Sequence, residues 1–389
     1  MYKVQTLNAI DPLGLSQLPT QLYEVANDLP HPDAILLRSA SLHDRDIPAS
    51  VKVIARAGAG VNNIPIKKFT QLGIPVLNTP GANANAVKEL VLAGLLLACR
   101  NICQAWDYVR QLDGDDAAIN SQVEQDKKRF AGFELPGKTL GIIGLGNVGV
   151  KVANAAIGLG MRVIGYDPTI TVKRAWELSA QVEEVLSLDD LMMQADAISL
   201  HVPLLPETRQ LINTTRLRLA KPGMILLNFA RDGIVDKTAV LAALDAHQLL
   251  AYVCDFPCTE LKNHPRVISL PHLGASTREA EQTCALMAVR QIRDYLENGT
   301  ITHSVNFPTL ELPFNQGMRL AIVNANVPSM VAQISTKLAD AKLNIVDLLN
   351  KSREEIAYTL IDVDGDVNEA VLKEISAIQG VIQVRCLAK

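Results

Sequence analysis

The sequence has few aromatic residues, few cysteines and no long apolar run. Aromatic side chains make up 4% of the 389 residues, and the six cysteines are too few for the disulfide scaffold of a small secreted domain. No His or Asp side chains accompany the cysteines at the spacing of metal ligands, so we expect no metal site. The longest strongly apolar run, Leu90–Cys99, ends at Arg100 and is about half as long as a membrane-spanning helix. It therefore predicts a buried helix.

The sequence also lacks an excess of positive charge, and we expect no leader at its amino terminus. Its formal net charge is -4, whereas a surface that binds nucleic acid needs clustered Lys and Arg. Polar and charged residues interrupt the segment MYKVQTLNAI, which has no apolar core of the signal-peptide type. What remains is the composition of a globular protein, 48% hydrophobic and 20% charged, long enough for two or three domains. We expect a cytoplasmic protein with reduced cysteines that binds neither nucleic acid nor membranes.

Short apolar runs alternate with helical stretches along most of the chain. Alternation of this kind predicts parallel sheets covered by helices on both faces. The charged segment 113–134 predicts an exposed connection or arm between two such series, and a helix is expected at 279–298. The second series, which begins at Lys138, matches a complete doubly wound domain. Strands are predicted at 34–37, 51–55 and 75–77 in the first series, and at 139–143, 162–166, 197–201, 224–228, 251–254 and 267–269 in the second.

The carboxy-terminal residues form a separate series. Residues 307–317 contain two prolines and a glycine, and they predict a linker. A βαββαβ order in the last seventy or so residues is that of a ferredoxin-like unit, which we expect to bind a ligand or a partner chain. Its strands are predicted at 319–324, 344–350, 355–362 and 381–387, and its helices at 329–341 and 367–378.

A glycine-rich loop follows the first strand of the second series. Gly144, Gly146 and Gly149 stand between the strand-like LGII and the helix-like VKVANAAIGLG. The first glycine permits a tight turn, the second lets a pyrophosphate approach the backbone, and the third lets the helix pack on the strand. Asp167 closes the next strand, where a carboxylate accepts hydrogen bonds from both ribose hydroxyls and repels a 2′-phosphate. The loop and Asp167 therefore predict that the cofactor is NAD rather than NADP.

Three charged residues follow later strands and suit hydride transfer from an alcohol. This reaction needs a base for the hydroxyl proton, a cation for the carboxylate and carbonyl, and exclusion of water. Arg231 in NFARDG can grip a carboxylate and still point at a neighbouring ketone oxygen. His272 in PHLG can take the proton, and Glu260 in DFPCTE would hold one imidazole tautomer if it reached that ring. Taken alone, each also fits an ordinary role as a surface arginine, a structural histidine or an exposed glutamate.

These motifs, in this order and over nearly the whole chain, resemble those of the D-isomer-specific 2-hydroxyacid dehydrogenases. GIIGLGNVG is similar to the family's NAD loop, NFARDGIVD to its arginine motif, DFPCTE to its glutamate motif and PHLGAST to its histidine motif. The resemblance implies that Arg231, Glu260 and His272 form the catalytic set. It also implies a substrate domain of residues 1–97 and 286–310, with a Rossmann NAD domain of residues 98–285 inserted between them. The cofactor-binding residues that it implies are Gly144, Gly146, Asn147, Val148, Gly149, Asp167, His201, Val202, Pro203, Ala230, Asp255 and Gly274.

Within the family, LLRSASLH, ARAGAGVNNI and NTPGANANAVKEL resemble the substrate loops of members that oxidise 3-phosphoglycerate to 3-phosphohydroxypyruvate, the first step of serine synthesis. This substrate has a carboxylate and a dianionic phosphate. Arg231 alone would leave the phosphate unpaired, and Arg38 and Arg56 are its natural complement. Asn62 and Asp232 depart from the commoner pattern, which has Asp and Gly there, without removing a reacting group. The substrate-binding residues that the resemblance implies are Arg38, Ser39, Arg56, Gly58, Ala59, Gly60 and Asn83.

Two other functions stay open at this point. The same chemistry suits glyoxylate, hydroxypyruvate or another 2-oxo acid, but an uncharged far end would give Arg38 and Arg56 no partner. A non-catalytic protein that senses NAD is the other alternative, and the complete set of Arg231, Glu260 and His272 argues against it. The resemblance implies at least a dimer through the NAD domains, either a homodimer or a homotetramer.

The carboxy-terminal domain, residues 317–389, resembles an ACT domain, which in related dehydrogenases binds L-serine across a dimer interface. The relevant pattern is an HxNxPG loop after the first strand and an Asn near the start of the second. Here the loop is NANVPS, in which Asn324 replaces the His and Ser329 replaces the Gly, whereas Asn326 and Asn344 match. The two matches make Asn326 and Asn344 candidates for binding an amino-acid effector. The two departures predict a weak or absent response to serine.

Overall fold

The computed structural model describes residues 1–314 and 317–388 and divides into two compact units. The first unit contains Met1–Ala82 and Glu281–Lys389, and the second, Asn83–Ala280, is inserted between these segments. Each unit is described by itself. Part of the predicted linker 307–317 falls at residues 315–316, which lie outside the described residues.

The first unit is built on a parallel five-stranded sheet in the order β2-β1-β3-β4-β5. Its central strand β3 has the sequence AILL and is buried at every position, as expected of a strand with helices on both faces. The strands predicted at 34–37, 51–55 and 75–77 are confirmed as β3, β4 and β5, whereas β1 and β2 were not predicted. The strands are β1 (Tyr2–Leu7), β2 (Tyr23–Ala26), β3 (Ala34–Leu37), β4 (Val53–Arg56) and β5 (Val76–Leu77), and the helices are α1 (Pro12–Leu15), α2 (Ile66–Gln71) and α11 (Arg278–Asn298).

The long helix α11 supplies much of the core of this unit. Its residues Cys284, Ala285 and Ala288 are buried in one cluster with apolar side chains of the sheet. The contact with α1 is close, because a Cβ added at Gly14 would lie 2.6 Å from the Cβ of Ala285. Small residues at this crossing therefore let the first turns of α11 pack closely against α1.

The second unit is built on a parallel seven-stranded sheet in the order β12-β11-β10-β9-β6-β7-β8. The six predicted strands are confirmed, and β8 adds a short edge strand of two exposed glutamates. The winding reverses at β6, with β7 on one side and β9 on the other, and ligands bind such sheets at the carboxyl ends beside this reversal. The strands are β6 (Thr139–Ile143), β7 (Arg162–Tyr166), β8 (Glu183–Glu184), β9 (Ala197–Leu200), β10 (Met224–Asn228), β11 (Leu249–Cys254) and β12 (Val267–Ser269).

Helices cover both faces of this sheet. The apolar run Leu90–Cys99 lies in α3, where a Cβ added at Gly94 would lie 3.0 Å from side-chain atoms of Phe229 and Val253. Because α3 packs on this sheet, the compact unit begins at Asn83. The helices are α3 (Ala84–Cys99), α4 (Ile102–Arg110), α5 (Asp116–Asp126), η1 (Lys127–Phe130), α6 (Gly149–Gly158), α7 (Val172–Glu177), α8 (Leu188–Gln194), η2 (Pro206–Thr208), α9 (Thr214–Leu217), η3 (Asp232–Ile234) and α10 (Lys237–Asp245).

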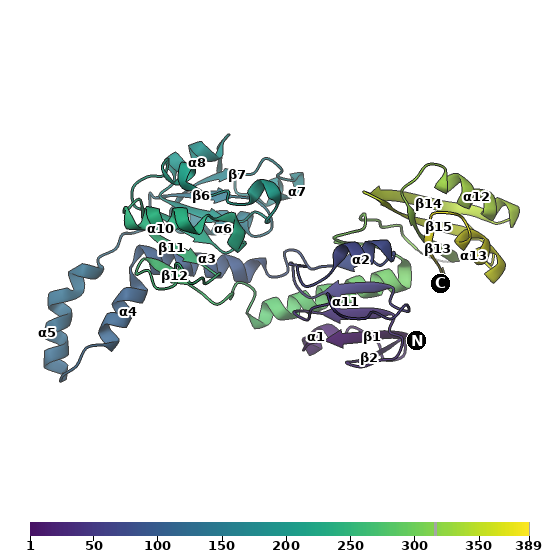
Figure 1. The fold of residues 1–389 in the computed structure, drawn as a ribbon, viewed down its shortest axis with the longest axis horizontal. Coiled ribbons are helices and arrows are strands. Elements are labelled where there is room, and N and C mark those ends of the chain that lie inside the picture. The colour runs from purple at the N-terminus through teal and green to yellow at the C-terminus, as the bar shows by residue number, and fades with distance from the viewer. Residues whose placement is uncertain (315–316, 389) are drawn as a thin grey trace. The chain divides into compact units, whose positions relative to one another are not determined.

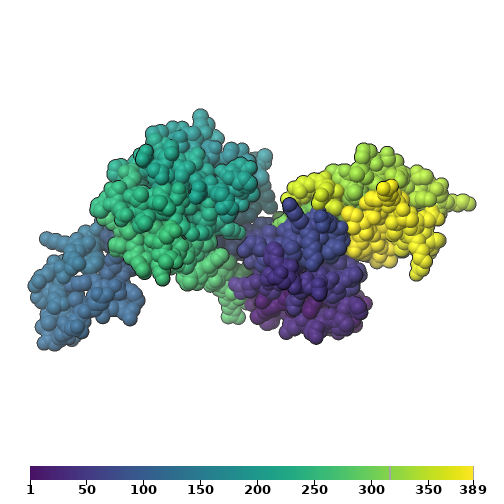
Figure 2. Space-filling view, in the orientation of Figure 1, coloured from purple at the N-terminus to yellow at the C-terminus, as the bar shows by residue number. Residues whose placement is uncertain are grey.

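The segment predicted as an exposed connection or arm is an arm, but it is helical. Helix α5 begins after Asp115, whose side chain accepts a hydrogen bond from Ala118 N at 2.9 Å, and it buries no residue. The hydroxyl of Tyr108 in α4 donates to Asp126 Oδ2 at 2.8 Å and joins the two helices. Helices α4 and α5 project from the rest of their unit (Figures 1 and 2).

The carboxy-terminal residues form an antiparallel sheet in the order β14-β15-β13-β16. Helices α12 and α13 pack on one face, where Leu320, Ile322, Ile334 and Ile375 share a core. This strand order with two helices on one face confirms the predicted ferredoxin-like unit. The elements are β13 (Met318–Ala325), α12 (Met330–Asp340), β14 (Asn344–Arg353), β15 (Ile356–Asp364), α13 (Glu369–Ser376) and β16 (Val381–Ala388).

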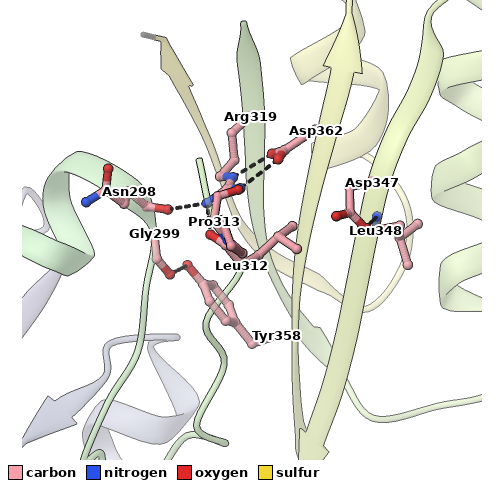
Figure 3. Close-up of polar contacts among 9 residues, drawn as sticks. All are labelled: Asn298, Gly299, Leu312, Pro313, Arg319, Asp347, Leu348, Tyr358 and Asp362. Carbon is pink, nitrogen blue, oxygen red and sulfur yellow. Dashed lines mark hydrogen bonds and ion pairs between the residues drawn. The ribbon is translucent and has the colours of Figure 1, made fainter. Parts of the chain in front are cut away.

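The other face of this sheet is anchored by Arg319, whose side chain is fully buried. The guanidinium binds the Asp362 carboxylate through Nε at 2.5 Å and Nη2 at 2.6 Å (Figure 3). The same group donates to the carbonyl oxygens of Asn298 at 3.0 Å, Leu312 at 2.8 Å and Pro313 at 2.8 Å. A single buried cation thus ties the sheet to the end of α11 and to the segment that follows it.

Two further side chains of the sheet bind the same helix end. The hydroxyl of Tyr358 donates to the Gly299 carbonyl at 2.7 Å (Figure 3), and Arg385 Nη2 donates to the Tyr295 carbonyl at 3.0 Å. The last four carbonyl groups of a helix have no N–H partner within the helix, and cations are favourable beside them. The carboxy-terminal domain therefore caps α11.

Candidate active site

The glycine loop lies between β6 and α6, and its glycines meet three different needs. Gly144 has a φ of 93°, and a side chain there would lie 2.8 Å from the carbonyl oxygen of His201. A side chain at Gly149 would collide with the Gly144 carbonyl oxygen, so α6 packs closely on the loop. At Gly146 nothing lies within 4 Å of the position of a Cβ, and the loop surface is open. This open surface beside the amino terminus of α6, where Asn147 and Val148 stand, fits a pyrophosphate.

Asp167 follows β7 and is held beside the glycine loop. Its Oδ2 accepts a hydrogen bond from Leu145 N at 2.8 Å. Its Oδ1 accepts from the backbone N and the hydroxyl of Thr169, at 2.9 Å and 3.0 Å. A carboxylate has about four acceptor positions, so these contacts orient Asp167 and leave capacity for a ribose hydroxyl.

The segment His201–Pro203 follows β9 on the other side of the glycine turn. His201 Nε2 shares a hydrogen bond of 2.8 Å with Ser199 Oγ, and burial lowers the pKa of His201 to about 3. The imidazole is therefore neutral at physiological pH. A side-chain carbon of Val202 lies 2.9 Å from where a Cβ of Gly144 would be, and the Pro203 carbonyl accepts from Thr208 Oγ1 at 2.6 Å. The segment therefore packs against the glycine loop with uncharged groups only.

Arg231 stands in the loop after β10, and Asn228 organises that loop. The fully buried Asn228 accepts from Ala230 N at 3.2 Å, and it donates to the Arg231 carbonyl at 3.0 Å and to the Tyr252 hydroxyl at 3.4 Å. The side chain of Arg231 is exposed, and its Nη1 donates to the Ala230 carbonyl at 2.6 Å. The backbone of Arg231 is thus fixed while its guanidinium faces the surface.

His272 stands in the loop after β12, and the buried Asp255 holds this loop. The Asp255 carboxylate accepts from Leu273 N and from Gly274 N, each at 2.7 Å. His272 has a φ of 56° and is exposed, and its ring meets that of Phe256 edge-on at 5.3 Å between centroids. A non-glycine residue in this conformation is strained and is kept there by its surroundings, as is common at active sites. Asp255, named from the sequence as a cofactor residue, here locks the turn that presents the histidine.

Glu260 lies in the turn after β11 and is exposed. It lines a pocket of about 300 Å³ together with Arg209 and the ion pair of Asp232 with Lys237, whose charged atoms are 2.7 Å apart. Among the described residues, no hydrogen bond or ion pair joins Glu260 to His272. The structure therefore does not bring the glutamate to the imidazole that it was expected to orient.

In the first unit, Arg38 and Arg56 lie at the carboxyl ends of the paired strands β3 and β4. The Arg56 Nε donates to the Arg38 carbonyl at 2.9 Å. A side chain at Gly58 would collide with the Arg56 guanidinium, so this glycine leaves room for the cation. Arg38 Nη1 lies 2.7 Å from Oε1 of Glu281 in α11. The Arg56 side chain thus lies against the backbone of Arg38, and although burial raises the pKa of the Cys284 thiol, both guanidinium groups act to lower it.

The neighbouring loops are held by asparagines. Asn8 Oδ1 accepts from the backbone N of Ser39 at 3.0 Å, and Asn78 Nδ2 donates to the carbonyl of Ala59 at 2.7 Å. Gly60 follows, half-buried, in the same loop as Ala59. Asn83 begins the second unit, where it precedes α3 without a capping side-chain bond. The sequence did not point to four residues that contact the predicted site residues, namely Asn8, Asn78, Asn228 and Glu281. Only Asn228 could have been found, because it is a polar residue at the end of a predicted apolar strand.

The two candidate effector residues lie far apart within one chain. Asn326 donates through Nδ2 to the Glu354 carbonyl at 3.0 Å, next to the Ile356 end of β15. Asn344 pairs with Asp364 at the opposite end of the same strand. One copy of the domain therefore does not form a site from both.

Among residues 1–314 and 317–388, no helix has the length and apolarity to cross a bilayer. The same part of the chain contains no group of three or more His, Cys, Asp or Glu side chains that could hold a metal ion.

Known proteins resemble this chain in sequence and in fold. Residues 92–274 match the family described as D-isomer specific 2-hydroxyacid dehydrogenase, NAD binding domain. D-3-phosphoglycerate dehydrogenase of Methanocaldococcus jannaschii is 35% identical over 84% of this chain and 61% of its own length, and that of Haemophilus influenzae is 33% identical over 84% and 79%. A solved NAD-bound 3-phosphoglycerate dehydrogenase of Entamoeba histolytica has 27% identity and a TM-score of 0.60, over 79% of this chain and 99% of that one. The chain spans about three fifths of the length of the first of these relatives.

Proposed function

This chain belongs to the D-isomer specific 2-hydroxyacid dehydrogenases, and we propose that it oxidises 3-phosphoglycerate to 3-phosphohydroxypyruvate with NAD, as a cytoplasmic enzyme of serine synthesis. The observation that carries the choice of substrate is the pair Arg38 and Arg56 in the first unit, where Arg56 Nε donates to the backbone carbonyl of Arg38 at 2.9 Å. A 2-hydroxy acid with a second anionic end needs such cations in addition to Arg231. The names of the curated relatives support the same substrate.

The residues of the second unit divide the chemistry among them. The glycine loop and Asp167 would hold NAD, and the bound cofactor would supply the acceptor for the hydride of carbon 2. Arg231 binds the carboxylate and stabilises the negative charge on the oxygen of the developing ketone. His272 takes the hydroxyl proton as the base, and in the reverse direction its protonated form returns that proton. Asp255 fixes the His272 loop through its two hydrogen bonds to backbone N–H groups.

Arg56→Ala should lower kcat/KM for 3-phosphoglycerate by about ten- to a hundred-fold, because hydrogen bonds to charged groups contribute about 1.5–3 kcal/mol. Oxidation of an unphosphorylated 2-hydroxy acid should change little. Steady-state assays with both substrates check this, with Arg290→Ala as the control, since the Arg290 side chain is 85% exposed on α11. Equal losses on the two substrates would count against a phosphate-binding role for Arg56.

Asp167→Asn should raise the KM for NAD about ten-fold and lower the preference for NAD over NADP by a similar factor. The substitution removes the charge that strengthens the bonds to the ribose and repels a 2′-phosphate. The control Thr169→Val removes one donor to the same carboxylate and keeps the charge. An unchanged cofactor preference in Asp167→Asn would contradict the role of Asp167.

The remaining assignments are proposals of the same kind. We assign 1–97 and 286–310 to the substrate domain, 98–285 to the NAD domain and 317–389 to an ACT-like domain, and we infer at least a homodimer. Asn326 and Asn344 lie at opposite ends of one sheet, so an amino-acid effector that touches both would take them from different copies of the chain.

A further inference from the structure

Arg38 and Arg56 form the proposed anion site of the first unit, and Arg38 is also ion-paired with Glu281. Oε1 of Glu281 is 2.7 Å from Nη1 of Arg38, and the side chains are 42% and 36% exposed. Both groups are thus within reach of a dissolved anion. A carboxylate already occupies one side of the guanidinium that was predicted to bind the substrate.

The backbone is fixed at both members of this pair. The Arg38 carbonyl accepts bonds from Arg56 Nε at 2.9 Å and from Asn63 Nδ2 at 3.3 Å. Glu281 precedes the residues of α11 that pack on the sheet, where Ala285 meets Gly14. The backbone thus places the Glu281 carboxylate within reach of the Arg38 guanidinium.

The Glu281 carboxylate offsets the positive charge of Arg38. A phosphate group carries close to two negative charges at neutral pH. Burial raises the pKa of the nearby Cys284 thiol, which therefore stays neutral and adds no charge. A phosphorylated ligand would meet Glu281 as a competing anion.

The Glu281 carboxylate can orient Arg38 for an anionic ligand or repel that ligand, and the sizes of these two effects can be compared. By orienting Arg38, an exposed ion pair would increase the affinity for the ligand by at most about five-fold. As a competing charge about 6 Å from a dianion on the same guanidinium, it weakens binding by about three- to ten-fold even in a medium as polar as water, with the lower figure at physiological salt. Many exposed ion pairs contribute nothing measurable, so repulsion is the larger effect.

We propose that Glu281 determines the anion specificity of this site by competing with the substrate's phosphate for Arg38. It lowers the affinity for a dianionic far end and thereby eases the release of phosphorylated ligands. This inference rests on the proposed function only for the identity of the substrate, since the competition concerns any dianion.

The test is isothermal titration of the full-length protein with inorganic phosphate. Glu281→Gln should bind phosphate about three- to ten-fold more tightly than the unmodified protein, because the amide keeps the shape and loses the charge. The KM for 3-phosphoglycerate should fall by a similar factor, and the KM for an unphosphorylated 2-hydroxy acid should not. Unchanged or weaker phosphate binding by Glu281→Gln would overturn the proposal.

Two further variants test whether the effect is specific to Glu281 and whether it depends on Arg38. Glu297→Gln changes the same residue type on the same helix, where it pairs with Arg293 at 3.2 Å, and it should leave phosphate binding unchanged. In an Arg38→Ala background, Glu281→Gln should lose most of its gain, and a gain kept in full would contradict competition for Arg38. If the unmodified protein does not oxidise 3-phosphoglycerate, the proposed substrate is wrong, while the phosphate titration still decides the role of Glu281.

Discussion

His272→Asn should lower kcat by about a hundred- to ten-thousand-fold, the range that a general base contributes. Asparagine is a suitable replacement because it tolerates the positive φ of position 272 better than most residues. The two hydrogen bonds from the Asp255 carboxylate to the backbone of the loop do not involve the imidazole and should persist. The loss should therefore reflect the missing base and not a collapsed loop.

The measurement is NADH absorbance under saturating substrate, together with titration of NAD into the same variant. NAD should bind His272→Asn about as tightly as it binds the unmodified protein, since His272 lies outside the glycine loop. A loss of less than ten-fold in kcat would show that another group takes the proton. An unmodified protein that binds NAD but turns over no hydroxy acid would favour the NAD-sensing alternative.

Arg319→Ala should destabilise the protein by about 3–5 kcal/mol, as expected when one partner of a buried ion pair is removed. The substitution leaves the Asp362 carboxylate without its cation and removes the donor to the carbonyls of Asn298, Leu312 and Pro313 (Figure 3). Urea unfolding followed by circular dichroism measures the change.

A matched pair of variants separates the buried charge from the packing. Arg319→Met combined with Asp362→Leu removes both charges and fills similar volume, so it should cost less than Arg319→Ala alone. The surface pair of Lys373 with Glu369 serves as the control, because both side chains are more than 80% exposed and Lys373→Ala should cost less than about 1 kcal/mol. A similarly small change for Arg319→Ala would mean that Arg319 does not anchor the carboxy-terminal domain.

Much of the fold could be predicted from the sequence, because buried parallel strands are short continuous apolar runs. The strands at 139–143, 162–166, 224–228 and 267–269 have the predicted bounds. The strands that were missed lack this signal: β1 alternates apolar with polar residues, β2 is a short YEVA interrupted by a glutamate, and β8 consists of two exposed glutamates. The charged arm was predicted to be exposed but not helical, since its stability depends on caps such as Asp115 rather than on an apolar face.

The candidate site was less predictable than the fold. The glycine loop is a local pattern, and the structure gives each of its glycines the environment that the pattern implies. The bond between Arg38 and Glu281 depends on how α11 packs on the sheet, which no local pattern reveals. For the same reason the sequence did not place Glu260 beside Asp232 and Lys237 rather than beside His272.

The account is tested most directly by NADH absorbance with purified protein, NAD and 3-phosphoglycerate at alkaline pH, with hydrazine to remove the keto product. We predict steady formation of NADH with 3-phosphoglycerate and none with lactate or glycerate. Activity on an unphosphorylated hydroxy acid but not on 3-phosphoglycerate would contradict the proposed substrate while leaving the family and the cofactor in place.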